Sequence, residues 1–279
     1  MAGTWECSNF AAQNVENTIT IGEITTALER FAPLPLQESY DNAGLQCGLT
    51  ETLVSGVLLC LDITEEVLQE AIDLECNLVV AHHPLLFRSV KHVCDTTIVE
   101  RCLRMAIKND IAIYAAHTNL DNAMDGVSFH MAEKLGLIDV QFLVPVENGT
   151  VKGGSGVIGF LPQEEDSLPF LQRVKQVFGV EALQHNQLLD RPVQSVALCG
   201  GAGSEMLDAA IKAEADAFIT GEMSYHRWFG HEQKIQIATI GHYESEQYTK
   251  EILRTILEQV APNMPIYDTQ VCTNPIHVL

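Results

Sequence analysis

The hydrophobic and polar positions of this chain follow two alternating patterns, one typical of buried strands and one typical of amphipathic helices. Short apolar runs predict strands at residues 56–62, 78–81, 111–116, 156–161, 195–199, 217–220 and 235–240, with a last short strand within 266–278. Apolar residues at helical spacing predict helices that follow the capping residues Thr20, Thr64 and Asp95, and further helices at residues 126–135, 166–178, 204–215 and 245–260. Strands that alternate with helices favour an α/β fold with mostly parallel sheets.

A glycine-rich stretch divides the chain into two parts of similar style. Residues 149–156 read Gly-Thr-Val-Lys-Gly-Gly-Ser-Gly, the richest concentration of turn residues in the sequence. We therefore predict a domain boundary here, between a first α/β domain in residues 1–147 and a second one that begins at residue 148. A chain of 279 residues is long enough for two domains with buried cores.

The charge balance narrows the possible partners and the location. The chain has 37 Asp and Glu residues against 16 Lys and Arg residues, a formal net charge of -21. Nucleic-acid binding depends on basic side chains that neutralise phosphates, so we expect no nucleic-acid partner. No apolar stretch is long enough to span a bilayer, and residues 1–13 lack the pattern of a signal peptide. The eight cysteines are dispersed without a C-x-x-C pair, which favours a reducing, cytoplasmic setting.

Two adjacent histidines, His82 and His83, end a predicted strand and precede Pro84. Neighbouring residues on a strand point to opposite sides, and the proline keeps His83 extended. The two imidazoles of such a pair cannot easily bind a single ion, whereas two ions side by side could each bind one imidazole.

Further candidate ligands follow two other predicted strands. His117 and Asp121 follow one of them, and His242 and Glu246 follow the other, at i and i+4 of a helix. Ligands of α/β sheets bind beyond the carboxyl ends of the strands, so these side chains are expected at one edge. Imidazoles with carboxylates suit Zn, Mn, Fe or Ni better than Mg or Ca, and a carboxylate bridging two ions is typical of two-metal hydrolases. We therefore predict two divalent metal ions.

These residues also have more ordinary interpretations. A single histidine at a strand end is more often a hydrogen-bonded loop residue than a ligand, although the coincidence at three strand ends favours a metal site. His117 is either a ligand or a residue that orients one. Asp62 either belongs to the site or only starts a turn. The other histidines outside the loops discussed here are interpreted as surface or structural residues.

Two glycine-containing loops are candidate parts of a pocket. Residues 199–204 follow a strand and open a helix, so Gly200, Gly201, Gly203 and Ser204 could hold a phosphate group, with a plain tight turn as the alternative. Residues 220–226 bring Glu222 and His226 to the same edge of the sheet. These two residues could act as acid and base, or Glu222 could simply favour the N-terminus of the next helix.

Five segments, taken together, resemble a known family. They are D-N-A-G-L-Q-C-G at residues 41–48, A-H-H-P at 81–84, H-T-N-L-D at 117–121, T-G-E-M-S-Y-H at 220–226 and G-H-Y-E-S-E at 241–246. The chain resembles the YbgI-type, Nif-three-like proteins, a group often labelled GTP cyclohydrolase 1 type 2 homologs. The resemblance covers nearly the whole chain, in a short form without an inserted middle domain. Glu222 departs from the family pattern, which more usually has Asp at this position.

The resemblance implies a dinuclear site. His83 and Asp121 would hold one ion, His82 and His242 would hold the other, and Glu246 would bridge the two. It also implies two related α/β domains with exchanged C-terminal segments, so that residues from about 230 to 279 complete the first domain and residues 148–229 form the second. A ring-shaped homohexamer is a further expectation.

The resemblance and the predicted ligands together favour a metal-dependent hydrolase of the GTP cyclohydrolase type, acting on a small anionic or nucleotide-like substrate. Glu222 and His226 are the candidate proton carriers, and His117 and the glycine loop are the candidate substrate contacts. The alternative is a non-catalytic metal-binding protein that acts through partners. A pocket fit for a small substrate would favour the enzyme, whereas ions sealed from solvent would favour the binding protein.

Overall fold

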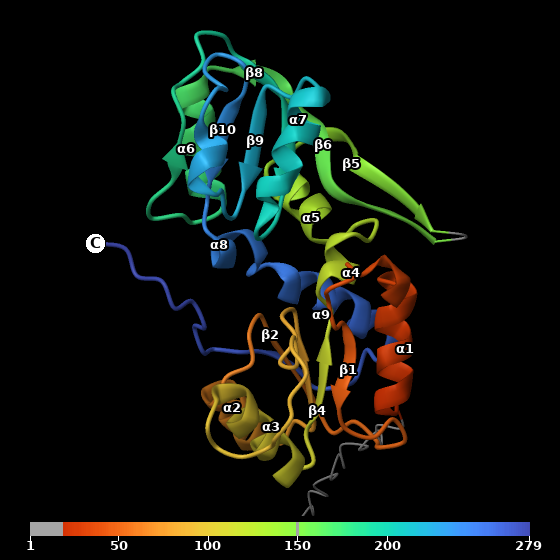
Figure 1. Cartoon of the computed structure of the whole chain (residues 1–279). Coiled ribbons are helices and arrows are strands. Elements are labelled where there is room, and N and C mark those ends of the chain that lie inside the picture. The colour runs from red at the N-terminus through yellow and green to blue at the C-terminus, as the bar shows by residue number, and fades with distance from the viewer. Residues whose placement is uncertain (1–18, 149–150) are drawn as a thin grey trace, which may run out of the picture.

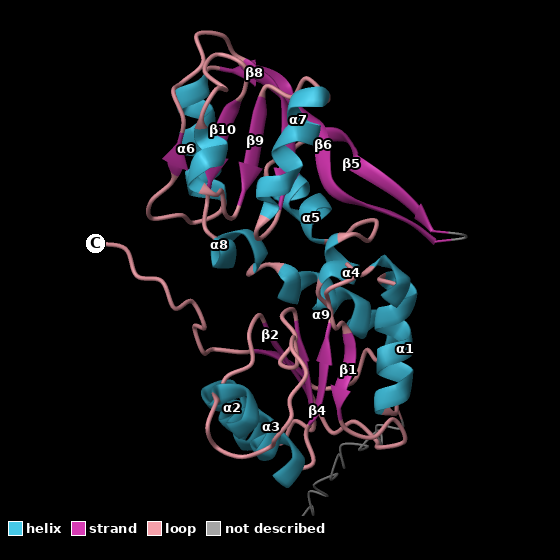
Figure 2. Ribbon diagram, viewed as in Figure 1, coloured by secondary structure: helices cyan, strands magenta, loops and turns pink. Residues whose placement is uncertain are grey.

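Two sheets organise the residues that the computed structural model describes, 19–148 and 151–279, and they form two α/β lobes (Figure 1). Helices cover the sheets in both lobes, as the prediction of two α/β domains requires (Figure 2). Residues 1–13, which are expected to carry no signal peptide, and Gly149 and Thr150 of the predicted boundary lie outside the described residues. Within the described ranges, no helix combines the length and the hydropathy needed to cross a bilayer.

The first sheet is mostly parallel, as predicted, and has the strand order β1-β4-β3-β2-β11. Its strands are β1 (Gly44–Cys47), β2 (Val57–Cys60), β3 (Leu78–Ala81), β4 (Ala112–Ala115) and β11 (Ile266–Asp268). Only β1 runs antiparallel to its neighbour, β4. Every residue of β2, β3 and β4 is buried, which explains why these strands appear in the sequence as unbroken apolar runs.

The helices of this lobe are α1 (Ile21–Phe31), α2 (Glu65–Asp73), α3 (Ile98–Lys108), α4 (Thr118–Asp121) and α9 (Thr249–Val260), with a short 3-10 turn η1 (Leu34–Leu36). Helix α5 (Val127–Lys134) contributes Val127 to the core of this lobe, and Met131 and Ala132 to the core of the second lobe. The predicted capping box at Thr20 and the cap at Thr64 are confirmed. The predicted cap Asp95 is wrong: Thr97 caps α3, because its hydroxyl accepts a hydrogen bond from the Glu100 amide at 3.2 Å.

The second sheet is mixed and has the strand order β5-β6-β8-β9-β10-β7. Its strands are β5 (Ile138–Asn148), β6 (Val151–Glu165), β7 (Gln184–His185), β8 (Val193–Cys199), β9 (Ala217–Thr220) and β10 (Gln236–Thr239). Only β8, β9 and β10 run parallel to one another. The helical segments of this lobe are α6 (Ser167–Val177), η2 (Gly203–Met206), α7 (Leu207–Lys212), η3 (Tyr225–Trp228) and α8 (His242–Glu246).

The glycine-rich stretch forms a strand where the sequence predicts a turn. Residues 151–156 lie in β6, which pairs with β5 along a long antiparallel hairpin. A Cβ atom at Gly154 would lie 2.6 Å from the carbonyl oxygen of Val144, so glycine is required there by close packing. Both β5 and β10 belong to the second sheet, whereas the predicted boundaries assign these strands to the first domain.

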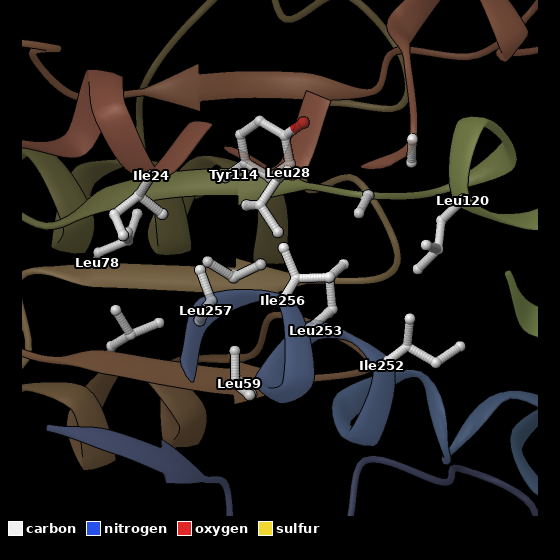
Figure 3. Close-up of a cluster of buried hydrophobic side chains, with 14 of the residues drawn as sticks. Ile24, Leu28, Leu59, Leu78, Tyr114, Leu120, Ile252, Leu253, Ile256 and Leu257 are labelled. Carbon is white, nitrogen blue, oxygen red and sulfur yellow. The ribbon is translucent and has the colours of Figure 1, made fainter. Parts of the chain in front are cut away.

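The C-terminal segment returns to the first sheet. Strand β11 pairs in parallel with β2, and Leu253, Ile256 and Leu257 of α9 lie in one buried cluster with Leu59 of β2 (Figure 3). Burying a side chain of this size contributes about 1.5–3 kcal/mol relative to its exposed state. The return agrees with the expectation that the last residues complete the first domain, and the exchange of segments stays a prediction.

Candidate metal centre

The carboxyl ends of strands from both sheets meet at one cluster of imidazoles and carboxylates. His82 and His83 follow β3, Asp121 ends the short helix α4 after β4, and His242 and Glu246 begin and end α8 after β10. The structure brings all five predicted metal ligands into two groups, in each of which one ligand atom per residue lies within 4.8 Å of the others. The rule that ligands gather beyond the carboxyl ends of strands therefore predicts the cluster correctly.

The first group consists of His82, Asp121 and Glu246. The Nδ1–H of His82 donates to the carbonyl oxygen of Ala116 at 2.7 Å, which leaves the lone pair of Nε2 unshared. This Nε2 atom lies 3.7 Å from Oδ1 of Asp121 and 3.6 Å from Oε1 of Glu246. Both His82 Nε2 and Asp121 Oδ1 are buried without a hydrogen-bond partner. Buried polar atoms almost always have a partner, so these two point to a group that lies between them.

The second group consists of His83, His242 and Glu246. The Nε2 atoms of His83 and His242 each lie 3.0 Å from Oε2 of Glu246 and 3.4 Å from each other. Two ligands at about 2.0–2.1 Å from a zinc-sized ion are separated by about 3.0–3.5 Å. These spacings therefore fit the edges of a coordination shell.

The distances group the predicted ligands differently from the division that the resemblance implies. The sequence analysis paired His83 with Asp121 and His82 with His242, whereas the distances place Asp121 beside His82 and His242 beside His83. Each of the two groups still has one imidazole of the adjacent pair, as the alternation along β3 requires. Glu246 presents Oε1 to one group and Oε2 to the other, the arrangement expected of a bridging carboxylate.

Carboxylates fix the orientation of the two imidazoles in the second group. Nδ1 of His83 lies 2.7 Å from Oδ1 of Asp62, and Nδ1 of His242 lies 2.9 Å from Oε1 of Glu222. A carboxylate that holds Nδ1–H leaves Nε2 as the metal-binding nitrogen. Asp62 is therefore part of the site rather than only a turn residue, and Thr273 donates to its second oxygen at 2.7 Å.

The cluster favours positive charge at its centre. Burial opposes a charge on His83, but hydrogen bonds with Asp62 and Glu246 raise its pKa to about 10. The hydrogen bond with Glu246 raises the pKa of His242 to about 9. Burial also raises the pKa of Asp121, which disfavours a bare carboxylate at this position. Protons and a divalent cation would therefore compete for this cluster.

His117 is held by a carboxylate to which the sequence analysis assigned no role. Nδ1 of His117 lies 2.7 Å from Oδ1 of Asp41, whose side chain is fully buried. Burial would raise the pKa of Asp41, but hydrogen bonds from His117 and Thr118 outweigh it and lower the pKa to about 2. His117 also forms a third potential ligand group with His82 and His83. The position of His117 is compatible with both of its predicted roles, a metal ligand or a residue that orients one.

A cavity of about 680 Å³ opens beside the cluster. The predicted ligands His83, Asp121, His242 and Glu246 line it, together with His117. Residues of both lobes form the remaining wall, among them Tyr40, Phe87, Ser155, Gly200 and Glu205. This volume lies within the range of small-molecule sites, about 300–1,000 Å³.

In the predicted phosphate-binding loop, two backbone amides and one hydroxyl already donate hydrogen bonds within the protein. The amide of Gly201 donates to Ser245 Oγ at 2.9 Å, and that of Gly203 donates to Thr220 Oγ1 at 3.0 Å. The hydroxyl of Ser204 donates to the carbonyl oxygen of Glu222 at 3.3 Å. These three groups are therefore not free to hold a phosphate group, and the predicted phosphate-binding role of the loop stays a prediction. Gly200 and Gly203 remain wall residues of the cavity.

The structure separates the two predicted proton carriers. Glu222 contacts His242, whereas His226 lies exposed on η3 with its ring 5.4 Å from that of Tyr225. Neither residue lines the cavity beside the ligands. Glu222 therefore holds the imidazole of His242, a predicted ligand. The acid–base role of Glu222 and His226 stays a prediction.

The chain is similar to known proteins along nearly its whole length. A family model described as Duf34/NIF3 (NGG1p interacting factor 3) matches residues 19–275. A Clostridium perfringens protein named "GTP cyclohydrolase 1 type 2 homolog" is 34% identical over 229 residues, covering 81% of this chain and 86% of that protein. The crystal structure of a Bacillus cereus protein related to NIF3 has 26% identity and a TM-score of 0.84, covering 94% of this chain and 100% of its own. The solved structure of protein ybgI, at 23% identity and a TM-score of 0.77 over 92% of this chain and 100% of its own, has the same fold.

Proposed function

Because the chain belongs to the Duf34/NIF3 family, we propose that it is a dinuclear metal-dependent hydrolase acting on a nucleotide-like substrate. One observation carries this proposal. The two oxygens of Glu246 face different imidazole groups, while His82 Nε2 and Asp121 Oδ1 lie buried beside it without partners. This donor set, with three imidazoles and two carboxylates, suits Zn, Mn, Fe or Ni.

The protein's own groups prepare the ligands. The carbonyl oxygen of Ala116 and the carboxylates of Asp62 and Glu222 hold the Nδ1–H groups of His82, His83 and His242. Each Nε2 is therefore available as a ligand. Bound divalent ions would supply Lewis acidity, which makes hydroxide available near neutral pH.

The open cavity favours an enzyme over a binding protein with sealed ions. Four of the five proposed ligands line it, so a small molecule could reach the ions. His117, fixed by Asp41, lies in the same wall and leaves Nε2 for other partners. It is the wall residue best placed to orient a substrate.

The name of the Clostridium perfringens relative suggests the reaction to test first. In a cyclohydrolase reaction on GTP, one water opens the imidazole ring of the purine to a formamide, and a second water hydrolyses the formamide and releases formate. The assay is formate release from GTP by metal-loaded protein. The blank is the Glu246→Ala variant, and the control is Glu164→Ala, which alters an exposed glutamate of β6.

Metal content is measured on the same samples. The wild-type protein and Glu164→Ala should hold two ions per chain and release formate, and Glu246→Ala should do neither. Retention of one ion at full occupancy by Glu246→Ala would show that this residue does not bridge. Untagged protein that holds no metal after purification without chelators would overturn the proposed site. Metal-loaded protein without turnover would exclude GTP as the substrate.

A further inference from the structure

An aromatic wall runs from the metal cluster along the cavity. The ring of His117 lies 5.3 Å from that of His82 and 5.4 Å from that of His83. The ring of Phe87 lies 6.0 Å from His117, and the ring of Tyr40 lies 6.3 Å from Phe87. All these pairs are edge-to-face contacts, which leave ring surfaces free for a further planar group.

Two rings of this wall remain open to a ligand. Phe87 is 42% exposed and Tyr40 is 65% exposed, and both line the cavity that contains the metal ligands. Aromatic side chains bury large apolar surfaces when they can, so rings left open in a cavity are typical of binding surfaces for flat molecules.

The same cavity is lined by several carboxylates, and its only basic side chains among the described residues are imidazoles of the predicted metal site. Its lining includes the four carboxylates of Glu38, Asp121, Glu205 and Glu246, and among the described residues that line it there is neither Lys nor Arg. The Glu205 side chain has no hydrogen bond or ion pair with another described residue, and Glu38 accepts one hydrogen bond, from Asn122 at 3.2 Å. Both carboxylates can therefore accept hydrogen bonds from a ligand.

Metal loading would neutralise the cavity without making it positive. Two divalent ions would bring four positive charges, which the four lining carboxylates balance. A phosphate monoester carries a charge of about -1.5 to -2 at neutral pH and needs positive partners when it is desolvated. Among the described residues that line the cavity no Lys or Arg supplies such a partner, and the amides of Gly201 and Gly203 in the adjoining loop are already paired.

From the aromatic wall and the charge balance, we propose that the cavity selects an uncharged or cationic planar nitrogen heterocycle, such as a nucleobase or nucleoside, over its phosphorylated forms. The ring stacks on Phe87 and Tyr40, and its amino groups donate to Glu38 or Glu205. This inference rests on the proposed function, since it treats the cavity beside the ions as the substrate site, and it names the part of a nucleotide-like molecule that is recognised.

The test compares two ligands that differ by one phosphate. Binding of guanosine and of guanosine monophosphate to the Zn²⁺-loaded full chain is measured by calorimetry. Guanosine should bind at least as tightly as the monophosphate. The Phe87→Leu variant should bind guanosine about tenfold more weakly at unchanged metal content, since base–aromatic stacking has about this value. Phe229→Leu, which alters a 58% exposed ring outside this cavity, should bind guanosine like the wild type.

Three results would overturn the proposal: tenfold tighter binding of the monophosphate, unchanged guanosine affinity in Phe87→Leu, or no guanosine binding at millimolar concentration. The formate assay separates this inference from the proposed hydrolase. Guanosine binding that depends on Phe87, in protein that releases no formate, would uphold the ligand class and reject the reaction. Formate release from GTP with a wild-type KM in Phe87→Leu would uphold the reaction and reject the ligand class.

Discussion

A methyl group added at Gly201 would collide with the carboxylate of Glu246. A Cβ atom at this position would lie 2.2 Å from Oε1 and 3.2 Å from Cδ of Glu246, whereas ordinary contacts begin at 3.4 Å. In Gly201→Ala, Oε1 must therefore retreat by about 1.2 Å, the difference between 3.4 and 2.2 Å. Oε1 is the oxygen that faces His82, so the substitution perturbs one side of the proposed bridge.

The displacement is large compared with what a metal site tolerates. Metal–ligand distances in protein sites vary by only about 0.2 Å from their usual values. A shift of about 1.2 Å would therefore remove Oε1 from the coordination shell. Changes to residues that only orient ligands already weaken metal binding about 10–100-fold. We therefore expect Gly201→Ala to lower metal affinity by at least about 100-fold, or about 2.7 kcal/mol.

A second glycine separates this clash from backbone strain. Gly201 has φ +58 and Gly136 has φ +71, but nothing lies within 4 Å of a Cβ atom built at Gly136. An alanine in this left-handed region lowers the free energy of unfolding by about 1–2 kcal/mol at either position. Urea unfolding of the metal-free proteins should therefore show similar losses for Gly201→Ala and Gly136→Ala. Competition with a fluorescent chelator should show weakened metal binding only in Gly201→Ala.

Either of two results would refute this reasoning. Wild-type metal affinity in Gly201→Ala would mean that Oε1 of Glu246 is not a ligand. An equal loss of affinity in Gly136→Ala would mean that general destabilisation, and not the contact with Glu246, weakens the site.

Three further predictions follow from other contacts. The pKa of Asp41 lies at about 2, below the 3.8 of an unperturbed Asp. Its charge should therefore raise the free energy of unfolding by about 2 kcal/mol above pH 4, and this contribution should disappear as the pH falls from about 4 to 2. Unfolding free energies of the wild type and Asp41→Asn should therefore differ at pH 6 and converge at about pH 2, and parallel curves would contradict the assignment. Asp62→Asn should weaken metal binding about 10–100-fold while the fold persists, because it loosens the hold on His83, and unchanged affinity in a chelator titration would disprove this role. Leu253→Ala should lower the free energy of unfolding in urea by about 2–5 kcal/mol, since this side chain is fully buried between α9 and the first sheet. A loss below about 1 kcal/mol would contradict the packing in Figure 3.

Local patterns were sufficient to predict most elements of the fold. Strand β9 has the predicted bounds, 217–220, and the strands that end near His82 and His117 lie within one or two residues of their predicted positions. Each of these strands is buried on both faces, so its position is visible as an unbroken apolar run. The i, i+4 spacing of His242 and Glu246 likewise predicts their contact, because one helical turn brings these side chains together.

Elements without such a local pattern were missed or predicted only in part. Of the long hairpin of β5 and β6, only residues 156–161 were predicted as a strand, because the rest is partly exposed and its glycine-rich part resembles a turn. Residues 245–260 were predicted as one helix, whereas the structure has α8 from His242 to Glu246 and α9 from Thr249 to Val260 with a break between them. The roles of Asp41 and Glu222 depend on hydrogen bonds to histidines 76 and 20 positions away in the chain, which no local spacing indicates.

The sequence by itself determined which residues are available for a metal site, because strand ends and helical spacing are local properties of the backbone. Only the tertiary structure decided how these residues combine. The side chain of Asp121 lies beside His82 and not His83, since the short helix α4 turns it toward that imidazole. The two oxygens of Glu246 reach both groups because the second lobe places α8 against the edge of the first sheet. Such contacts depend on the packing of two lobes, and residues more than 100 positions apart in the chain meet only through it.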